Sequence, residues 1–281
     1  MLAVGVNKFS FKYSNIGATP SLTPGTAVTP GASNAEGSWT EVASAANISQ
    51  DIYGFLLWVS GGATSTQQKD HLLDIGVDPA GGTSYTAIIS NIICGESPAI
   101  TNAGVLGRFY YFPHRIKSGS SVAVRIQGNN ATAGTVQVVM EFYGQPSHPE
   151  LVRAGQYAET IGTITNSGGV TFTPGDTGTE GAWTSLGTTT RALWWWQLCV
   201  QVSSGTISGR TYYLDLAYGD ASNKVVIIEN LPLAAGGSET IAHPLAINAF
   251  CEVPAGAEIF IRGTCDSTAQ NLNAVAVGIG G

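Results

Sequence analysis

This 281-residue chain contains an internal repeat, in which segments of its first half recur in the same order in its second half. Thr29-Pro-Gly is followed by Glu36-Gly-Ser-Trp-Thr, and Thr173-Pro-Gly is followed at the same spacing by Glu180-Gly-Ala-Trp-Thr. Four more segments match in the same order: Tyr53–Val59 with Trp194–Val200, Leu73–Gly76 with Leu214–Ala217, Ile88–Asn91 with Ile227–Asn230, and Ile116–Gly119 with Val253–Gly256. The offset shrinks in small steps, as changes of loop length between fixed strands would produce. We infer an internal duplication.

The duplication predicts two domains, which also suits the length, since a domain usually spans about 100–200 residues. We expect a first domain over residues 25–144 and a second over 156–281. Residues 145–155 hold two prolines that block a regular ladder, and they read as a linker. Residues 1–24 form an N-terminal arm or a first strand plus a tether.

The segments inside each copy read as strands. Ser121–Gln127, Thr135–Tyr143 and Ala257–Arg262 alternate or run apolar, and they are rich in β-branched residues. No window shows a helical stripe of apolar residues. The fold class expected is therefore all-β, with two tandem antiparallel β-sandwich domains of jelly-roll type.

Strand alternation sorts the side chains of the aromatic segments by face. One face carries Tyr53, Phe55, Leu57 and Val59 in the first copy, and Trp194, Trp196, Leu198 and Val200 in the second. We assign this face to the core. Trp58 and Trp195 then point the other way, which makes them candidates for an interface, with the other domain or with a partner, or for glycan contact.

Composition excludes several classes of function. Charged residues make up 11% of the chain, against about a quarter in most soluble domains, and the net charge is −7. No basic patch is visible, so we expect no nucleic-acid partner. We find no signal peptide and no apolar stretch long enough to span a bilayer, so no membrane contact is expected.

No residue pattern marks a metal or cofactor site. The four cysteines and four histidines lack zinc-ligand spacing, so we expect no metal and no cofactor. The cysteines are expected to be free thiols. Whether Cys251 and Cys265 pair is left open by the sequence.

No catalytic residue is predicted. The chain lacks the Gly-x-Ser-x-Gly, His-Glu-x-x-His and Ser-x-x-Lys motifs, and it shows no pair of carboxylates suited to glycoside hydrolysis. Asp74 and Asp215 recur between the copies. They could form a carboxylate site used twice, but we favour a structural role in which each bonds backbone amides of the following turn.

The other recurring pair combines an acid with a tryptophan. Glu36 precedes Trp39, and Glu180 precedes Trp183. We expect a turn that leads into a strand whose tryptophan packs inward. An exposed platform for a sugar ring is the alternative.

The N-terminal segment has an amphipathic strand pattern. Phe9, Phe11 and Tyr13 alternate with lysine and serine. The segment is either the first strand of the first domain or a docking arm that adds a strand to a neighbouring subunit.

Part of the first copy resembles a pattern in virion proteins of tailed bacteriophages. The resemblance rests on Leu72–Gly82, Ile88–Asn91, Tyr111–Gly119 and Val122–Arg125. The second copy departs from it, because Ala242–Asn248 replaces the aromatic segment, although Val253–Gly256 and Arg262 are retained. The resemblance implies a jelly-roll-like virion component, either a capsid decoration (cement) protein or a tail or fibre module.

We therefore expect a non-enzymatic capsid decoration protein that binds the major capsid protein and copies of itself. The oligomer expected is a trimer, because proteins of this kind are commonly trimers. Its place would be the virion, after assembly in the host cytoplasm. The alternative is a tail or fibre protein for host adsorption, which would grip glycans with exposed aromatic side chains.

Overall fold

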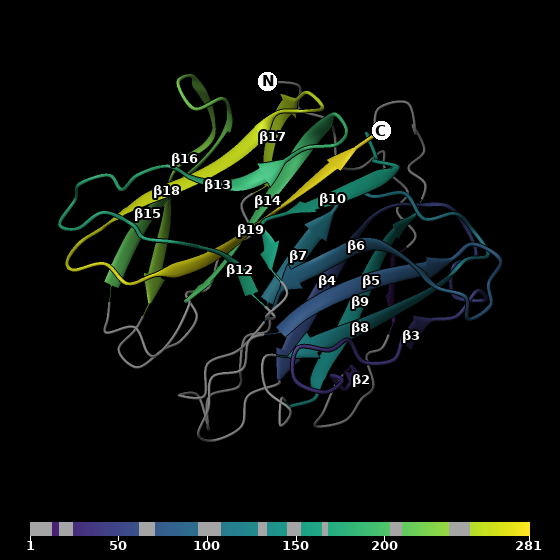
Figure 1. Ribbon diagram of the computed structural model, residues 1–281. Helices are drawn as coiled ribbons and strands as arrows, with labels where there is room; N and C mark the ends of the chain where they lie inside the picture. Colours follow the sequence, from purple (N-terminus) through teal and green to yellow (C-terminus); the bar gives the residue numbers. More distant parts are fainter. Residues whose placement is uncertain are drawn as a thin grey trace.

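A computed structural model describes nine stretches of the chain: residues 13–16, 25–61, 71–94, 108–128, 134–144, 153–164, 168–202, 210–235 and 248–281. All the regular elements in these stretches are β-strands, paired antiparallel in four sheets. The predicted all-β fold of two tandem sandwiches is confirmed (Figure 1). No helix in the described part of the chain is long and apolar enough to cross a membrane.

The first sandwich contains strands β1 to β9. One sheet has the order β1-β9-β4-β7, with β2 also paired to β9, and the other has the order β3-β8-β5-β6. The strands are β1 (Tyr13–Ile16), β2 (Thr26–Val28), β3 (Thr40–Ala43), β4 (Ile52–Gly61), β5 (His71–Asp78), β6 (Thr86–Ile93), β7 (Arg108–Phe112), β8 (Ser121–Gly128) and β9 (Val136–Gly144).

The second sandwich repeats this arrangement. One sheet has the order β11-β12-β19-β14-β17, with β10 also paired to β19, and the other has the order β13-β18-β15-β16. The strands are β10 (Tyr157–Ile161), β11 (Thr163–Ile164), β12 (Gly168–Phe172), β13 (Thr184–Thr188), β14 (Leu193–Val202), β15 (Arg210–Gly219), β16 (Lys224–Ala235), β17 (Asn248–Val253), β18 (Glu258–Cys265) and β19 (Leu272–Gly280).

The strand registers match between the copies. Asp74 on β5 stands opposite Arg125 on β8, and Asp215 on β15 stands opposite Arg262 on β18. Strands β4 and β9 correspond to β14 and β19, and the edge strand β6 corresponds to β16. The duplication seen in the sequence is therefore a duplication of the whole two-sheet unit.

The predicted core faces hold for most positions but not at the start of each aromatic strand. Phe55, Leu57 and Val59 fill the first core, and Trp196, Leu198 and Val200 fill the second. Tyr53 is only half-buried, and Trp194 is absent from the second core. The strand register shifts between Ile52 and Gly54 and between Leu193 and Trp195. These bulges break the alternation on which the prediction relied.

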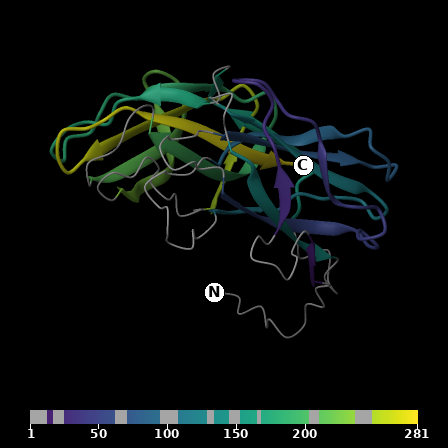
Figure 2. The same ribbon diagram turned by 90° about the horizontal axis from the view of Figure 1, so that it is seen from below.

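The two sandwiches meet edge to face. Edge strand β6 of the first lies across β10, β14 and β19 of the second (Figure 1), and the two units lie side by side (Figure 2). Trp195 is fully buried at this contact, with its ring edge-on to that of Phe112 at a centroid distance of 5.7 Å. The Thr160 hydroxyl donates to the Ser90 carbonyl at 2.5 Å. Val275, Val277 and Ile279 complete the apolar face from β19.

Candidate functional site

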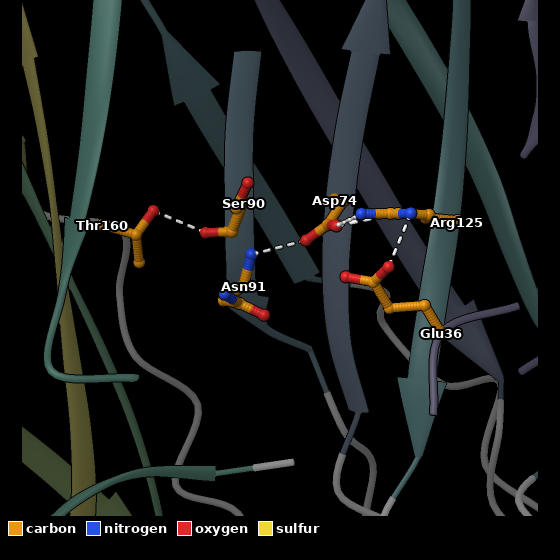
Figure 3. A network of polar contacts seen from close by, with 6 residues as sticks. All are labelled: Glu36, Asp74, Ser90, Asn91, Arg125 and Thr160. Carbon is orange, nitrogen blue, oxygen red and sulfur yellow. Dashed lines mark hydrogen bonds and ion pairs between the residues drawn. The ribbon is translucent and has the colours of Figure 1, made fainter. Parts of the chain in front are cut away.

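The repeated acids belong to a polar network on the outer side of the β3-β8-β5-β6 sheet (Figure 3). Arg125 Nε donates to Asp74 Oδ2 at 2.9 Å, and its Nη1 lies 2.5 Å from a Glu36 carboxylate oxygen. The guanidinium sits 4.4 Å from the centroid of the Trp39 ring. Asp74 Oδ1 accepts the backbone N–H of Asn91 at 2.8 Å.

The second sandwich carries the same network. Arg262 Nε and Nη2 donate to Asp215 at 2.9 and 2.8 Å, and the guanidinium lies 4.4 Å from the Trp183 centroid. Asp215 also accepts the Asn230 backbone N–H at 2.8 Å, and Glu180 lies 3.5 Å from Arg262. Burial, followed by the charge of the neighbouring aspartate, raises the pKa of Glu36 and of Glu180.

This network is built to hold strands together. Asn91 and Asn230 have left-handed backbones, with φ of 58° and 51°, next to register shifts between the paired strands. The two buried aspartates bond the amides at these irregular points, so they brace bulges. The prediction that each acid bonds its own following turn is wrong, because the amide belongs to the neighbouring strand and the main partner is an arginine.

The ring of Trp39, the tryptophan of the network, is not an open surface for a sugar. Arg125 covers one side of Trp39, and a Cβ added at Gly76 would come within 2.7 Å of the ring. The ring therefore lies against the outer side of β5. The prediction of inward packing is wrong, and the alternative of an exposed platform is not supported, because the ring is half-buried and Arg125 covers one of its faces. Trp183 has the same arginine contact.

The remaining predicted site residues lie in three different places. Phe9 and Phe11 fall outside the described residues, while the backbone of Tyr13 pairs with Tyr143 in β9, as a first strand of the first sandwich would. Trp195 is buried between the sandwiches and is not open to a glycan. Trp58 is 37% exposed and stacks on Phe109 at 5.2 Å on the outer face of the first sandwich.

A hollow of about 460 Å³ opens where the linker meets β14 and β17. Arg153 lies 4.4 Å from the centroid of the Trp194 ring and pairs with Glu252 at 2.9 Å. Tyr157 anchors the wall by donating its hydroxyl to the Ala192 carbonyl at 2.9 Å. The hollow thus combines aromatic rings with an acid–base pair.

Two aromatic side chains at this hollow differ in how open they are to a ligand. The Trp194 indole N–H has no acceptor among the described residues, although the side chain is buried. Its nitrogen has almost no accessible surface, so a ligand in the hollow does not reach it. Phe250 stacks on Trp194 at 6.3 Å and is itself 75% exposed, so it offers a free aromatic face beside the hollow.

Sequence reasoning missed these residues because they differ between the copies. By strand register, the counterparts of Phe250 and Glu252 in the first sandwich are Pro113 and Arg115. Residues that recur in both copies belong to the arginine–aspartate network, which is present in both sandwiches. A search for repeated residues passes over a site that one copy has alone.

A second hollow, of about 390 Å³, lies between the sandwiches and is lined by His114, Glu159 and Arg191 among others. His114 is buried, and its Nδ1 bonds the Arg115 carbonyl. Burial lowers the pKa of His114 below its ordinary value of 6.5. The imidazole is therefore neutral in the folded chain near neutral pH.

The lowered pKa of His114 predicts an acid-sensitive fold. The unfolded chain takes up a proton near pH 6.5 that the folded chain resists, so the stability from this group is full above pH 6.5 and falls as the pH drops below it. We expect a lower Tm at pH 5.5 than at pH 7.5, and a smaller difference in His114→Gln. Calorimetry at both pH values measures this. An unchanged difference in the variant would assign the sensitivity to other groups.

No protein-family model and no curated protein matches the chain. Solved structures resemble it in fold. PNGF-II aligns at 10% identity over 98% of this chain and 66% of its own, with a TM-score of 0.36. PNGase F, a glycosylasparaginase from Flavobacterium meningosepticum, aligns at 13% identity over 95% and 96%, with a TM-score of 0.36. The tandem CBM22 domain of Paenibacillus barcinonensis Xyn10C aligns at 7% identity over 98% and 93%, with a TM-score of 0.27.

These similarities correct the expected function. The chain aligns over nearly all of its length with PNGase F, an enzyme, which contradicts the expectation of a non-enzymatic capsid decoration protein. We withdraw both the decoration role and the expectation that the chain is not an enzyme. At such identities and TM-scores the likeness concerns the fold, so the function has to be argued from the chain's own residues.

Proposed function

We propose that this chain is a glycan-binding protein that holds a sugar at the hollow lined by Trp194 and the Arg153–Glu252 pair, with the exposed ring of Phe250 beside it. The observation that carries the proposal is the exposed ring of Phe250, which stacks on Trp194 beside the exposed Arg153–Glu252 pair. A sugar suits this arrangement, because its C–H face packs on aromatic rings and its hydroxyl groups form hydrogen bonds with charged side chains.

The charged pair suits the same ligand. Arg153 and Glu252 are both largely exposed and joined by one contact of 2.9 Å. The guanidinium has further donors and the carboxylate further acceptors for vicinal hydroxyls. With one charge of each sign, the hollow favours a neutral sugar over a strongly charged one. Residence on a virion, as part of a tail or fibre, stays a prediction.

Binding to a glycan array, followed by calorimetry on the hits, tests the proposal. We expect Phe250→Ala to weaken the affinity about tenfold, since an aromatic contact is worth roughly 0.5–1.5 kcal/mol and 1.4 kcal/mol is tenfold. Glu252→Gln should weaken it as well. The matched control is Tyr213→Ala, because Tyr213 is an aromatic residue, 43% exposed, on strand β15 and outside the hollow.

Three results would overturn the proposal. The first is an array on which no glycan binds. The second is an affinity that Tyr213→Ala lowers as much as Phe250→Ala does. The third is release of product from a bound glycan, detected by mass spectrometry, which would make the hollow a reaction site instead of a binding site.

A further inference from the structure

The contact between the two sandwiches has two halves, an edge and a face. The first sandwich supplies the edge strand β6, together with Phe112 of β7, and the second supplies the face formed by β10, β14 and β19. Trp195, Cys199, Val275, Val277 and Ile279 of this face are all fully buried. The chain therefore contains a complete example of how one sandwich binds the edge of another.

Because the unit is duplicated, the second sandwich has an edge of its own and the first has a face of its own. Neither of these two surfaces takes part in the contact between the sandwiches. The second sandwich has its own edge strand, β16, at the position of β6. The first has its own face, formed by β1, β4 and β9, at the positions of β10, β14 and β19. Within the described part of the chain, no strand crosses this face as β6 crosses its counterpart.

Part of the unused edge exposes apolar side chains. Val225 and Val226 on β16 are 52% and 42% exposed. By strand register they correspond to Thr86 and Ala87 on β6, and Ala87 lines the hollow between the sandwiches. At these two positions the exposed edge carries larger apolar side chains than the edge already in contact, while the exposed Glu229 stands at the position of Ser90.

The unused face is apolar as well. Trp58 corresponds by register to the buried Cys199, and Val139 and Tyr143 correspond to Val275 and Ile279. Trp58 and the stacked Phe109 are both exposed, at 37% and 46%. Among the described side chains of β4 and β9 on this face, Glu141 is a polar departure, half-buried at the position of Val277. Exposed apolar surface of this kind commonly marks an interaction site.

We propose that copies of this chain associate head to tail, with the β16 edge of one copy packed across the β1-β9-β4 face of the next. The occupant is a second copy of this chain. The contact between its two sandwiches already shows that the edge of one duplicated unit fits the face of the other. The contact is heterologous, since its two surfaces differ, so it propagates into a filament or closes into a ring. It leaves the Trp194 hollow outside the contact surfaces and goes beyond glycan binding.

Two variants of the full-length protein block one surface each. Val226→Glu places a charge on the edge, and Trp58→Glu places one on the face, while Thr188→Glu is the control at an exposed position on β13, the opposite edge strand of the sheet that contains β16. Sedimentation equilibrium over rising concentration should show self-association of the wild type and of the control. Each blocking variant should need at least about tenfold higher concentration to associate, since a buried unpaired charge costs more than 1.4 kcal/mol. Near-UV circular dichroism checks that each variant is folded.

Mixing the two blocking variants provides the decisive measurement. The Trp58→Glu copy keeps its edge and the Val226→Glu copy keeps its face, so an equimolar mixture should form a 1:1 dimer and stop there. A wild type that stays monomeric at millimolar concentration overturns the proposal. So does a mixture that stays monomeric although the wild type associates, because a two-fold interface between identical surfaces cannot be restored by mixing.

Discussion

Replacing Trp195 with alanine is expected to cost about 3–5 kcal/mol of folding stability, the range for deleting a buried tryptophan or phenylalanine ring. Trp195 is fully buried between the sandwiches and packs edge-on against Phe112. Its removal opens a cavity in the contact that joins the two units, and rigid strands on both sides limit collapse into it. Urea unfolding followed by tryptophan fluorescence measures the loss.

The same variant should also separate the unfolding of the two sandwiches. Each has its own core cluster, but the first cluster extends through Trp195 and β19 into the second unit. Weakening this link should split one calorimetric transition into two. Trp58→Ala is the control, because Trp58 also points outward from its strand but is exposed. A loss below about 1 kcal/mol for Trp195→Ala, or equal losses for both variants, would contradict a central role for Trp195.

The fold was predictable because its signals are local or repeated. Alternation places Phe55 and Leu57 in the core, and it points Trp195 away from the core, toward what proves to be the other sandwich. The strand bulge before Trp195 was not predictable from alternation. A bulge adds one residue to one strand, and its position depends on the partner strand, which a single segment does not specify.

The polar network shows a different limit. The recurrence of Asp74 and Asp215 indicated that these acids matter, but the partner of Asp74 is Arg125, 51 residues away on the neighbouring strand. Only the sheet order β8-β5-β6 brings the arginine, the acid and the Asn91 amide together. The clue in the sequence was the recurrence of an arginine six residues after the last matched segment, at Arg125 and Arg262.

The candidate glycan site was the least predictable part. Phe250 and Glu252 have no like counterparts in the first copy, and Arg153 belongs to the predicted linker. Their convergence depends on how the linker returns to the second sandwich, where Gly155 bridges to the segment after β7. A site that arises in one copy after duplication is found by comparing where the copies differ.

Removing the arginine of either network should be strongly destabilising. We expect Arg125→Met to cost about 3 kcal/mol, the lower end of the range for breaking a buried ion pair, because Arg125 keeps some solvent contact while Asp74 keeps almost none. The methionine preserves much of the apolar contact with Trp39. The loss of folding stability therefore measures the cost of leaving the Asp74 carboxylate without its charged partner. Urea unfolding at pH 7 measures it.

The double variant Arg125→Met/Asp74→Asn distinguishes a bare charge from lost packing. An amide oxygen can still accept the Asn91 N–H, and it carries no charge that needs a partner, so the double variant should recover more than half of the loss. Arg262→Met and Asp215→Asn give the same cycle in the second sandwich, where the distances are nearly the same. If both cycles give coupling energies within about 0.5 kcal/mol of each other, the duplicated network is energetically as well as geometrically repeated. A double variant no more stable than Arg125→Met would show instead that the arginine acts mainly through its stacking on Trp39.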